Sequence, residues 1–285
     1  MRAYRWELRK LIAQRRTLLG LIAVVLIPVG FAVGLAVSPA KPPPPGEPPE
    51  ADAVLSLAYN SSGLVLPVIA LSFSSLVFLP LLAALVAGDI VATEETNRTL
   101  KTVLTRSTSR LQLLGAKATA TATYVLVLLV LFGVSGIVAG GIANGANPVT
   151  LGGDPLGTGF TLTAPALGPA AVTARLALVL ADYAAPLLAV SAWGFMLSTV
   201  TGNSAASIVG MLVFSLANQV LGLIPNLPAV LSHWLLTGQF TAWQAALGTT
   251  IDSGPLLRAV AVSALYGIPP LLFSAWWFQR RDVLV

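Results

Sequence analysis

The residues that could do chemistry are few in this sequence. Cysteine is absent and His233 is the single histidine, so a thiolate nucleophile or a metal site of converging cysteines and histidines cannot form. The chain has no Gly-x-Ser-x-Gly, His-Glu-x-x-His or Gly-x-x-x-x-Gly-Lys-Ser/Thr pattern, the marks of hydrolases, zinc proteases and phosphate-binding loops. We therefore expect a chain that is not an enzyme and that binds no metal, nucleotide or other cofactor itself.

Three polar residues lie in or beside long apolar stretches. Asp182 directly precedes one such stretch, which places it either at the outer membrane interface near Arg175 or inside the membrane, where ionisable groups are usually functional. Asn218 and Gln219 lie within another stretch. They either make hydrogen bonds between helices or line a candidate translocation path.

These residues must be positioned by membrane-spanning helices. Hydrophobic residues make up 56% of the 285 and charged residues 9%, against about 25% charged in soluble domains. Six apolar runs approach the roughly 20 residues that a spanning helix needs. They cover residues 18–37, 64–87, 118–140, 183–200, 204–224 and 256–278. The sequence predicts an all-α integral membrane protein with one transmembrane domain over residues 1–285.

The basic residues predict the orientation of this domain. Thirteen of the 16 lysines and arginines lie in the N-terminal segment, in residues 88–117 and at the C-terminus, and the other side holds only Lys41, Arg175 and Arg258. The positive-inside rule then places both termini in the cytoplasm. Because the basic residues gather at the ends of apolar runs, the high pI of 9.9 indicates topology and not a nucleic-acid partner.

The N-terminal residues 1–17 have an apolar stripe at helical spacing among basic residues. We expect them to form a helix on the cytoplasmic membrane surface, where basic residues attract anionic lipid and tryptophan anchors the interface. The residues assigned to this interfacial helix are Arg5, Trp6, Arg9 and Lys10.

The connection 88–117 is longer than its task requires. About 4–6 residues would join two neighbouring helices, but this segment has about 30 and begins with the acidic pair Glu94 and Glu95. Leu100, Val103 and Leu104 follow at helical spacing. Ser109 then suits the cap of a further helix that runs into the third apolar run. This pattern favours a cytoplasmic helix with an apolar edge that docks onto a partner.

In residues 88–117 the chain resembles the type 2 permeases of ABC exporters, which are membrane subunits driven by a separate ATPase. The matching residues are Glu94-Glu95, Thr99-Leu100, Val103-Leu104-Thr105, Arg110 and Lys117, together with the ending Trp276-Trp-Phe-Gln-Arg280-Arg281-Asp282-Val. The chain departs from the family pattern at Arg98, where a glycine is usual, at Ser107, where a proline is usual, and at Gly115, which is not adjacent to the lysine.

The resemblance implies a multi-pass permease of the cell membrane that works as a homodimer or heterodimer among membrane lipids. Each copy would dock one cytoplasmic ABC ATPase subunit, which holds ATP and Mg. The segment between spans two and three would be the coupling helix, and its implied ATPase-coupling residues are Glu94, Glu95, Thr99, Leu100, Val103, Leu104, Arg106 and Arg110.

Other functions stay open beside this one. An ion-coupled secondary transporter would want ionisable residues inside its spans, for which Asp182 is the candidate. A membrane scaffold needs no such residues, and an intramembrane enzyme would need a catalytic constellation that this sequence lacks.

Overall fold

The computed structural model describes residues 2–37, 59–96, 109–150, 166–222, 224, 233–248 and 250–280. These residues are helical except for turns and a two-residue antiparallel ladder, in which β1 (Val149–Thr150) pairs with β2 (Ala166–Leu167). The all-α class that the sequence predicts is confirmed. The longer helices are α1 (Arg2–Ala13), α2 (Arg15–Val37), α8 (Arg110–Asn144), α9 (Pro169–Thr201), α10 (Ser204–Gly222) and α13 (Ser253–Arg280), and the shorter are η1 (Gly63–Val65), α4 (Leu66–Ser74), α5 (Phe78–Ala87), α6 (Ala92–Thr96), α12 (Leu236–Gln239) and η2 (Ala242–Ala246).

Four helices of the described chain are long and apolar enough to cross a membrane, namely α2, α8, α9 and α13. A fifth crossing is present if the bent helices on either side of Ser75–Val77 count as one. The apolar part of α10 is shorter, from Ser204 to Asn218. These helices are compatible with a membrane protein, and the predicted number of six spans stays a prediction.

The second predicted span is a broken helix. The segments Gly63–Ser74 and Phe78–Thr96 meet at an angle of 71°. Pro80 lies near the start of α5, and its ring would collide with the carbonyl of Leu76 in a continuous helix,. The break exposes the Ser75 carbonyl, which accepts a 2.6 Å hydrogen bond from the hydroxyl of buried Tyr183 on α9. A side chain of α9 therefore stabilises the break.

Two helices extend well beyond the predicted spans. The 35 residues of α8 correspond to about 52 Å at 1.5 Å per residue, against about 30 Å of hydrocarbon. It starts at a capping box in which Ser109 and Gln112 satisfy each other's backbone N–H groups,, as the predicted Ser109 cap requires. The fourth predicted span began at residue 183, but α9 begins at Pro169, a residue that suits the first helical turn,. Asp182 consequently lies inside a helix and not at its end.

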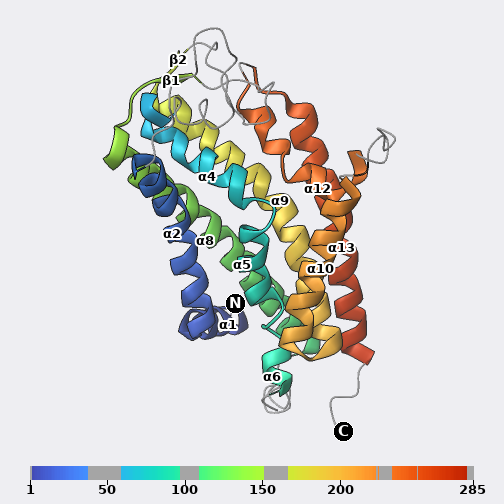
Figure 1. The fold of residues 1–285 in the computed structure, drawn as a ribbon. Helices are drawn as coiled ribbons and strands as arrows, with labels where there is room; N and C mark the ends of the chain where they lie inside the picture. The colour runs from blue at the N-terminus through green and yellow to red at the C-terminus, as the bar shows by residue number, and fades with distance from the viewer. Residues whose placement is uncertain are drawn as a thin grey trace.

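The long helices α2, α8, α9 and α13 run between the upper and lower ends in Figure 1, with α9 at the centre and β1 and β2 toward the upper end. The indole N–H of Trp193 on α9 donates to the Tyr266 carbonyl of α13 at 3.1 Å. Gly267 of α13 faces Ala189, where an added β-carbon would come within 3.3 Å of the Ala189 Cα. This close approach explains why 61% of the most apolar stretch of α9 is buried, against 22% for α2.

The aromatic residues near α12 and η2 do not all belong to the surface. Trp234, which lies just before α12, is exposed. Phe240 and Trp243 are buried, however, and the Phe240 ring packs edge-on against Tyr183 at 5.7 Å. Arg175 of α9 donates to the carbonyl of Ala246 at 2.9 Å and also to that of Gly248. This segment therefore folds back onto α9.

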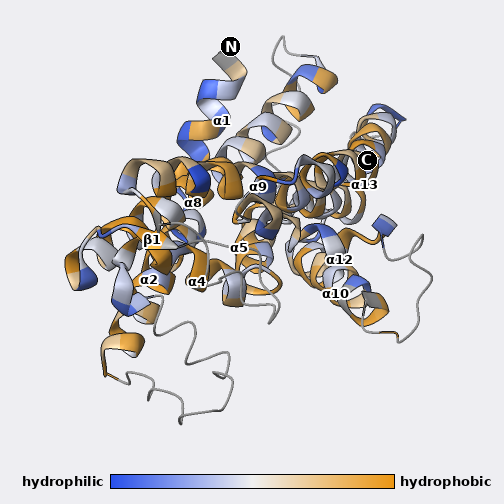
Figure 2. Ribbon diagram, turned by 90° about the horizontal axis from the view of Figure 1, so that it is seen from above, coloured by the Kyte–Doolittle hydropathy of each residue, from blue (hydrophilic) through white to orange (hydrophobic). Residues whose placement is uncertain are grey.

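Hydrophobic residues dominate most of the bundle in Figure 2, whereas α1 carries many hydrophilic ones. On α1 the side chains of Arg5, Trp6 and Arg9 are exposed, and those of Glu7 and Leu11 are buried. The amphipathic helix that the sequence predicts at the N-terminus is thus present. Its buried face turns toward α8, where the Tyr4 and Thr123 hydroxyls lie 2.9 Å apart.

Candidate functional site

A buried lysine lies at the centre of the candidate site. The side chain of Lys117 on α8 is 2% exposed, and its Nζ lies 3.0 Å from the Glu7 Oε2 of α1 and 2.9 Å from the Glu94 Oε1 of α6. It also donates to the Ile90 carbonyl at 3.3 Å. Three acceptors match the three N–H donors of an ammonium group, so a charge that would be costly to bury alone is fully compensated.

A second lysine shares one of these carboxylates. Lys10 of α1 pairs with the same Oε1 of Glu94, and its Nζ lies 5.3 Å from the centre of the Trp6 ring. We call Glu7, Lys10, Glu94 and Lys117 the ionic cluster. It contains two acids and two bases, and it joins α1, α6 and the first turns of α8.

The electrostatics of the cluster keep Glu94 ionised. Glu94 lies beyond the apolar run that ends at Ala87, and burial by itself would raise the pKa of its carboxyl group. The charges and hydrogen bonds of Lys117 and Lys10 outweigh burial and lower that pKa from its ordinary value,. Glu94 is therefore held in its charged form.

Local sequence explains how these side chains meet. Glu7 and Lys10 are three residues apart on α1, which places them on one face of that helix. The capping box at Ser109 sets the start of α8, so Lys117 falls on the same buried face as Leu113 and Leu114. Glu94 follows the turn at Asp89–Val91 and points inward, with 2% of its side chain exposed.

A second polar group lies beside the ionic cluster. Asp89 accepts hydrogen bonds from the hydroxyls of Thr93 and Ser204, and its Oδ1 lies 2.9 Å from the Arg16 guanidinium at the start of α2. These four residues, which we call the Asp89 cluster, join α2, α6 and α10. They line a polar cavity of about 450 Å³ together with Gln14, Arg15 and Thr96.

The segment before α6 is also attached to α9. The Ser198 hydroxyl of α9 accepts hydrogen bonds from the backbone N–H groups of Val91 at 3.3 Å and Ala92 at 3.0 Å. At the end of α9, Gly202 has a φ of 61°, and an added β-carbon would collide with the Glu95 carboxylate. The start of the predicted coupling segment is therefore fixed to five helices, α1, α2, α8, α9 and α10.

The predicted coupling residues fall in different environments. Glu94 was expected among the residues that couple to the ATPase, but its side chain is buried in the ionic cluster. Glu95 is half-buried beside Gly202. Arg110 donates to the Gln279 carbonyl near the end of α13 at 3.2 Å. Thr99, Leu100, Val103, Leu104 and Arg106 lie outside the described residues.

The predicted interfacial residues keep their exposed positions with one exception. Arg5, Trp6 and Arg9 are exposed, whereas Lys10 turns partly inward to Glu94. The sequence pattern did not indicate this role of Lys10, the burial of Lys117 or the participation of Glu7. A signal for Glu7 was present, because it is the single acidic residue among residues 1–37.

The polar residues of the apolar helices are not part of these clusters. Asp182 is 5% exposed within α9, and its Oδ2 has no hydrogen-bond partner among the described residues. The helix begins before Asp182, at Pro169, and its depth in a membrane stays a prediction. The Asn218 amide donates to the Phe214 carbonyl of its own helix at 3.0 Å, and the side chain of Gln219 lies outside the described part. Within the described ranges, no three His, Asp or Glu side chains are close enough to hold a metal ion.

The fold defines a class, an all-helical protein whose long apolar helices are compatible with a membrane location. The chain belongs to a family described as a protein of unknown function (DUF2705), whose model matches residues 54–284. Glu94 and Lys117 lie within the matched segment, and Glu7 and Lys10 precede it. A search of curated proteins finds no match.

Proposed function

We propose that this chain is the permease subunit of an ATP-driven ABC exporter, with ATP and Mg bound by a separate cytoplasmic ATPase subunit. The proposal rests on the resemblance of residues 88–117 to type 2 permeases, and the apolar helices and the distribution of basic residues support it. The bent pair α4 and α5 would be the second of six spans and α10 the fifth. Both termini would be cytoplasmic, and two permease copies would form the dimer.

The structural observation that best supports the proposal is the ionic cluster, which joins residues on either side of residues 97–108. Glu94 lies just before residues 97–108 and Lys117 shortly after them, and the two side chains meet at 2.9 Å. A force applied to the loop by an ATPase would act on this contact and through it on α1 and α8. Since Ser198 and Gly202 attach the same segment to α9, the central helix would respond as well. Such coupling requires a structural element with two conformations, and both the ATPase contact and the membrane helices must change the balance between them.

In this proposal the roles of the coupling residues differ. Leu100, Val103 and Leu104 form the apolar contact with the ATPase, with Thr99 beside them, and Glu95, Arg106 and Arg110 supply the polar rim. Glu94 acts from inside, because a buried carboxylate with two ammonium partners cannot also reach a partner protein. It would transmit the movement to Lys117.

The test is to co-express the chain with the ATPase encoded nearest to it and to change one docking residue. Leu100→Asp should abolish co-purification of the ATPase, because a charge replaces an apolar contact. Leu100→Met keeps the volume and apolar character and serves as the matched control. Both variants should reach the membrane in equal amounts. ATPase that co-purifies equally with the Asp variant would contradict the docking role.

One observation favours a second function, that of an ion-coupled transporter. Asp182 is buried in α9, and its Oδ2 has no hydrogen-bond partner in the part of the chain that the structure describes. Neighbouring Tyr183 donates to the Ser75 carbonyl at the break between α4 and α5. Broken helices and buried acids together are typical of proton or sodium sites in secondary transporters. This function predicts gradient-driven proton flux by the purified chain alone in proteoliposomes, with loss of the flux in Asp182→Asn. The exporter proposal predicts no flux without the ATPase.

A further inference from the structure

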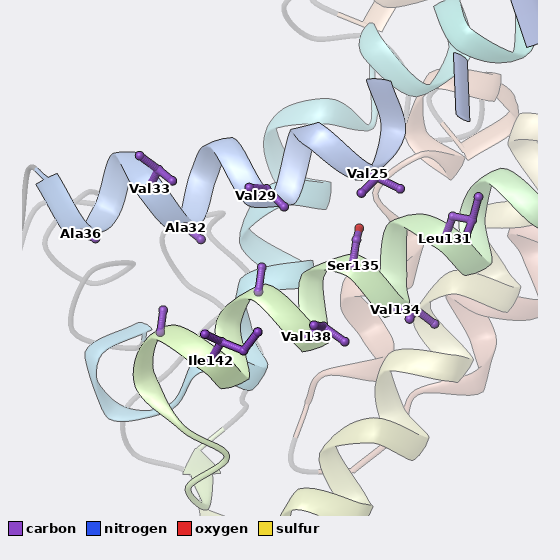
Figure 3. A pocket seen from close by; sticks show the side chains of 12 residues that line it. Val25, Val29, Ala32, Val33, Ala36, Leu131, Val134, Ser135, Val138 and Ile142 are labelled. Carbon is purple, nitrogen blue, oxygen red and sulfur yellow. The ribbon is translucent and has the colours of Figure 1, made fainter. Parts of the chain in front are cut away.

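A lateral groove runs between α2 and α8 at the end of the bundle remote from the ionic cluster (Figure 3). It has a volume of about 640 Å³, and its walls come from residues 25–36 of α2 and 131–143 of α8. The two helices run in the same direction here, with Val25 and Leu131 at one end of the groove and Ala36 and Ile142 at the other in Figure 3. None of the described lining residues belongs to the ionic cluster or to the predicted coupling segment.

The chemistry of the groove is apolar throughout. Among the described lining residues, Ser135 alone has a polar side chain, and its hydroxyl already donates to the Phe132 carbonyl of its own helix at 3.0 Å. This described lining contains no charged group that would bind a headgroup or an ionic ligand. An occupant therefore gains from burial of apolar surface and from dispersion contacts alone.

The length of the groove indicates which kind of apolar molecule fits it. The 11 steps from Val25 to Ala36 span about 17 Å along α2, which is about half of a hydrocarbon core of about 30 Å. The length of the groove therefore suits one hydrocarbon chain of a single leaflet.

We propose that the groove between α2 and α8 is a binding site for a hydrocarbon chain of a membrane lipid from the leaflet remote from the ionic cluster. Ala32 lies at the floor with 7% of its surface exposed, whereas Val134, Val138 and Ile142 stand exposed at the rim. A bound chain would cover these rim residues, and α2 would then be held to α8 through lipid as well as by direct contact. This inference depends on residence in a bilayer and is independent of the ATPase.

The site is tested with the full chain reconstituted in phosphatidylcholine vesicles that contain a phosphatidylcholine with a diazirine in its acyl chain. After illumination, adducts mapped by mass spectrometry should concentrate in residues 25–36 and 131–143. Exposed positions of α13 such as Leu265 and Leu272 report ordinary lipid contact. Labelling of the groove no stronger than that of α13 would overturn the proposal.

Filling the groove supplies the matched comparison. In the double variant Ala36→Leu and Ala139→Leu, groove adducts should fall about fivefold or more. The added side chains exclude methylene groups of the acyl chain from the groove, and the free energy gained by burying those groups is lost. The double variant Ala261→Leu and Ala264→Leu makes the same change on the exposed face of α13 and should leave groove adducts unchanged. Ala36→Leu alone, at an exposed position, should give an intermediate loss even if the double variant folds poorly. Groove adducts that persist at full level in the single variant and in a folded double variant would contradict the site.

The competing occupant, a second copy of the chain, gives a distinct result. Because the chain has no cysteine, Val138→Cys introduces a single thiol at the rim of the groove. Efficient disulfide crosslinking between copies in the membrane would assign the groove to a protein interface and overturn the lipid site. These experiments use neither ATP nor a partner, so their failure would leave the exporter proposal untouched, and a missing ATPase would leave the lipid site untouched.

Discussion

Lys117 concentrates most of the polar contacts that hold the candidate site together. Its ammonium group contacts carboxylates from two different helices and one carbonyl, and 2% of its side chain is exposed. A lysine in such a position is stable only while its partners are present, because an unpaired buried charge costs several kcal/mol. The same holds for the two carboxylates when the lysine is removed.

Replacing Lys117 should therefore destabilise the protein strongly. Lys117→Met removes the charge but keeps a long apolar stem, and it leaves Glu7 and Glu94 buried with one basic partner fewer. The loss should be of the order of 3–5 kcal/mol, typical of a broken buried ion pair. Thermal unfolding of the detergent-purified protein measures it.

Two comparisons show whether the charge is responsible. The triple variant Lys117→Met, Glu7→Gln and Glu94→Gln should regain much of the loss, because it leaves only Lys10 charged at a partly exposed position. Arg15→Met changes an exposed cation and should have little effect. A Lys117→Met protein that unfolds at the normal temperature would mean that the cluster contributes no stability.

Among the structural elements, α8 and η1 are joined by two glycines. A β-carbon on Gly63 or on Gly140 would collide with the backbone carbonyl of the other residue. The contact is reinforced where the Gly63 N–H donates to the Gly145 carbonyl at 3.0 Å and where the Asn144 amide donates to the Tyr59 carbonyl at 2.9 Å. Small residues permit such close packing of backbones in membranes.

Adjacent glycines of α8 should respond oppositely to alanine. Gly140→Ala forces two backbones apart and should destabilise the protein by at least the 1–3 kcal/mol typical of overpacking. Gly141→Ala meets open space and should be neutral or stabilising by about 1 kcal/mol, since alanine favours the helix. Thermal unfolding of the two variants under the same conditions gives the comparison. Equal unfolding temperatures would show that the glycine contact is not tight.

For the molecule as a whole, polar and basic groups gather at one end. The α1 helix, the α6 helix and the last turn of α13 lie toward the lower end in Figure 1, and the ladder of β1 and β2 lies toward the upper end. The lower end contains both clusters and most of the basic residues of the described chain. The positive-inside rule makes this end the cytoplasmic one in our proposal.

This orientation predicts which end an impermeant maleimide reaches. Ala13 at the end of α1 and Ala146 after α8 are both exposed, and the chain has no native cysteine. Ala146→Cys should be labelled in intact cells, and Ala13→Cys only after permeabilisation. Labelling in the reverse order would reject the proposed topology, and labelling of both in intact cells would reject a location on opposite sides of the membrane.

Features of the candidate site could be predicted from the sequence where the interacting residues are close together along the chain. The Ser109 cap and the helix that follows were predicted because a capping box involves residues three apart. The acidic pair before the loop was also recognised, but the direction of Glu94 was not. Its orientation depends on Lys10, 84 residues away, and on Lys117, and pairing across such separations leaves no periodic signal.

In the broken second span, some features follow from the local sequence and others depend on a distant helix. Its apolar composition predicts a membrane-length segment, and Pro80 alone marks a point of weakness. The break itself is stabilised by Tyr183 of a distant helix, which satisfies the freed carbonyl of Ser75. The extension of α9 to Pro169 was missed for a related reason, because polar residues such as Arg175 and Asp182 end a hydropathy run without ending a helix.

The sequence by itself determined the helical class, the apolar runs, the amphipathic N-terminal helix and the concentration of basic residues, since each depends on composition or short-range spacing. Only the tertiary structure decided that Glu7, Lys10, Glu94 and Lys117 form one cluster and that Asp182 is buried within α9. It also decided that α2 and α8 leave an apolar groove between them. Burial and ion pairing depend on which helices become neighbours, and that choice is made by packing over the whole chain.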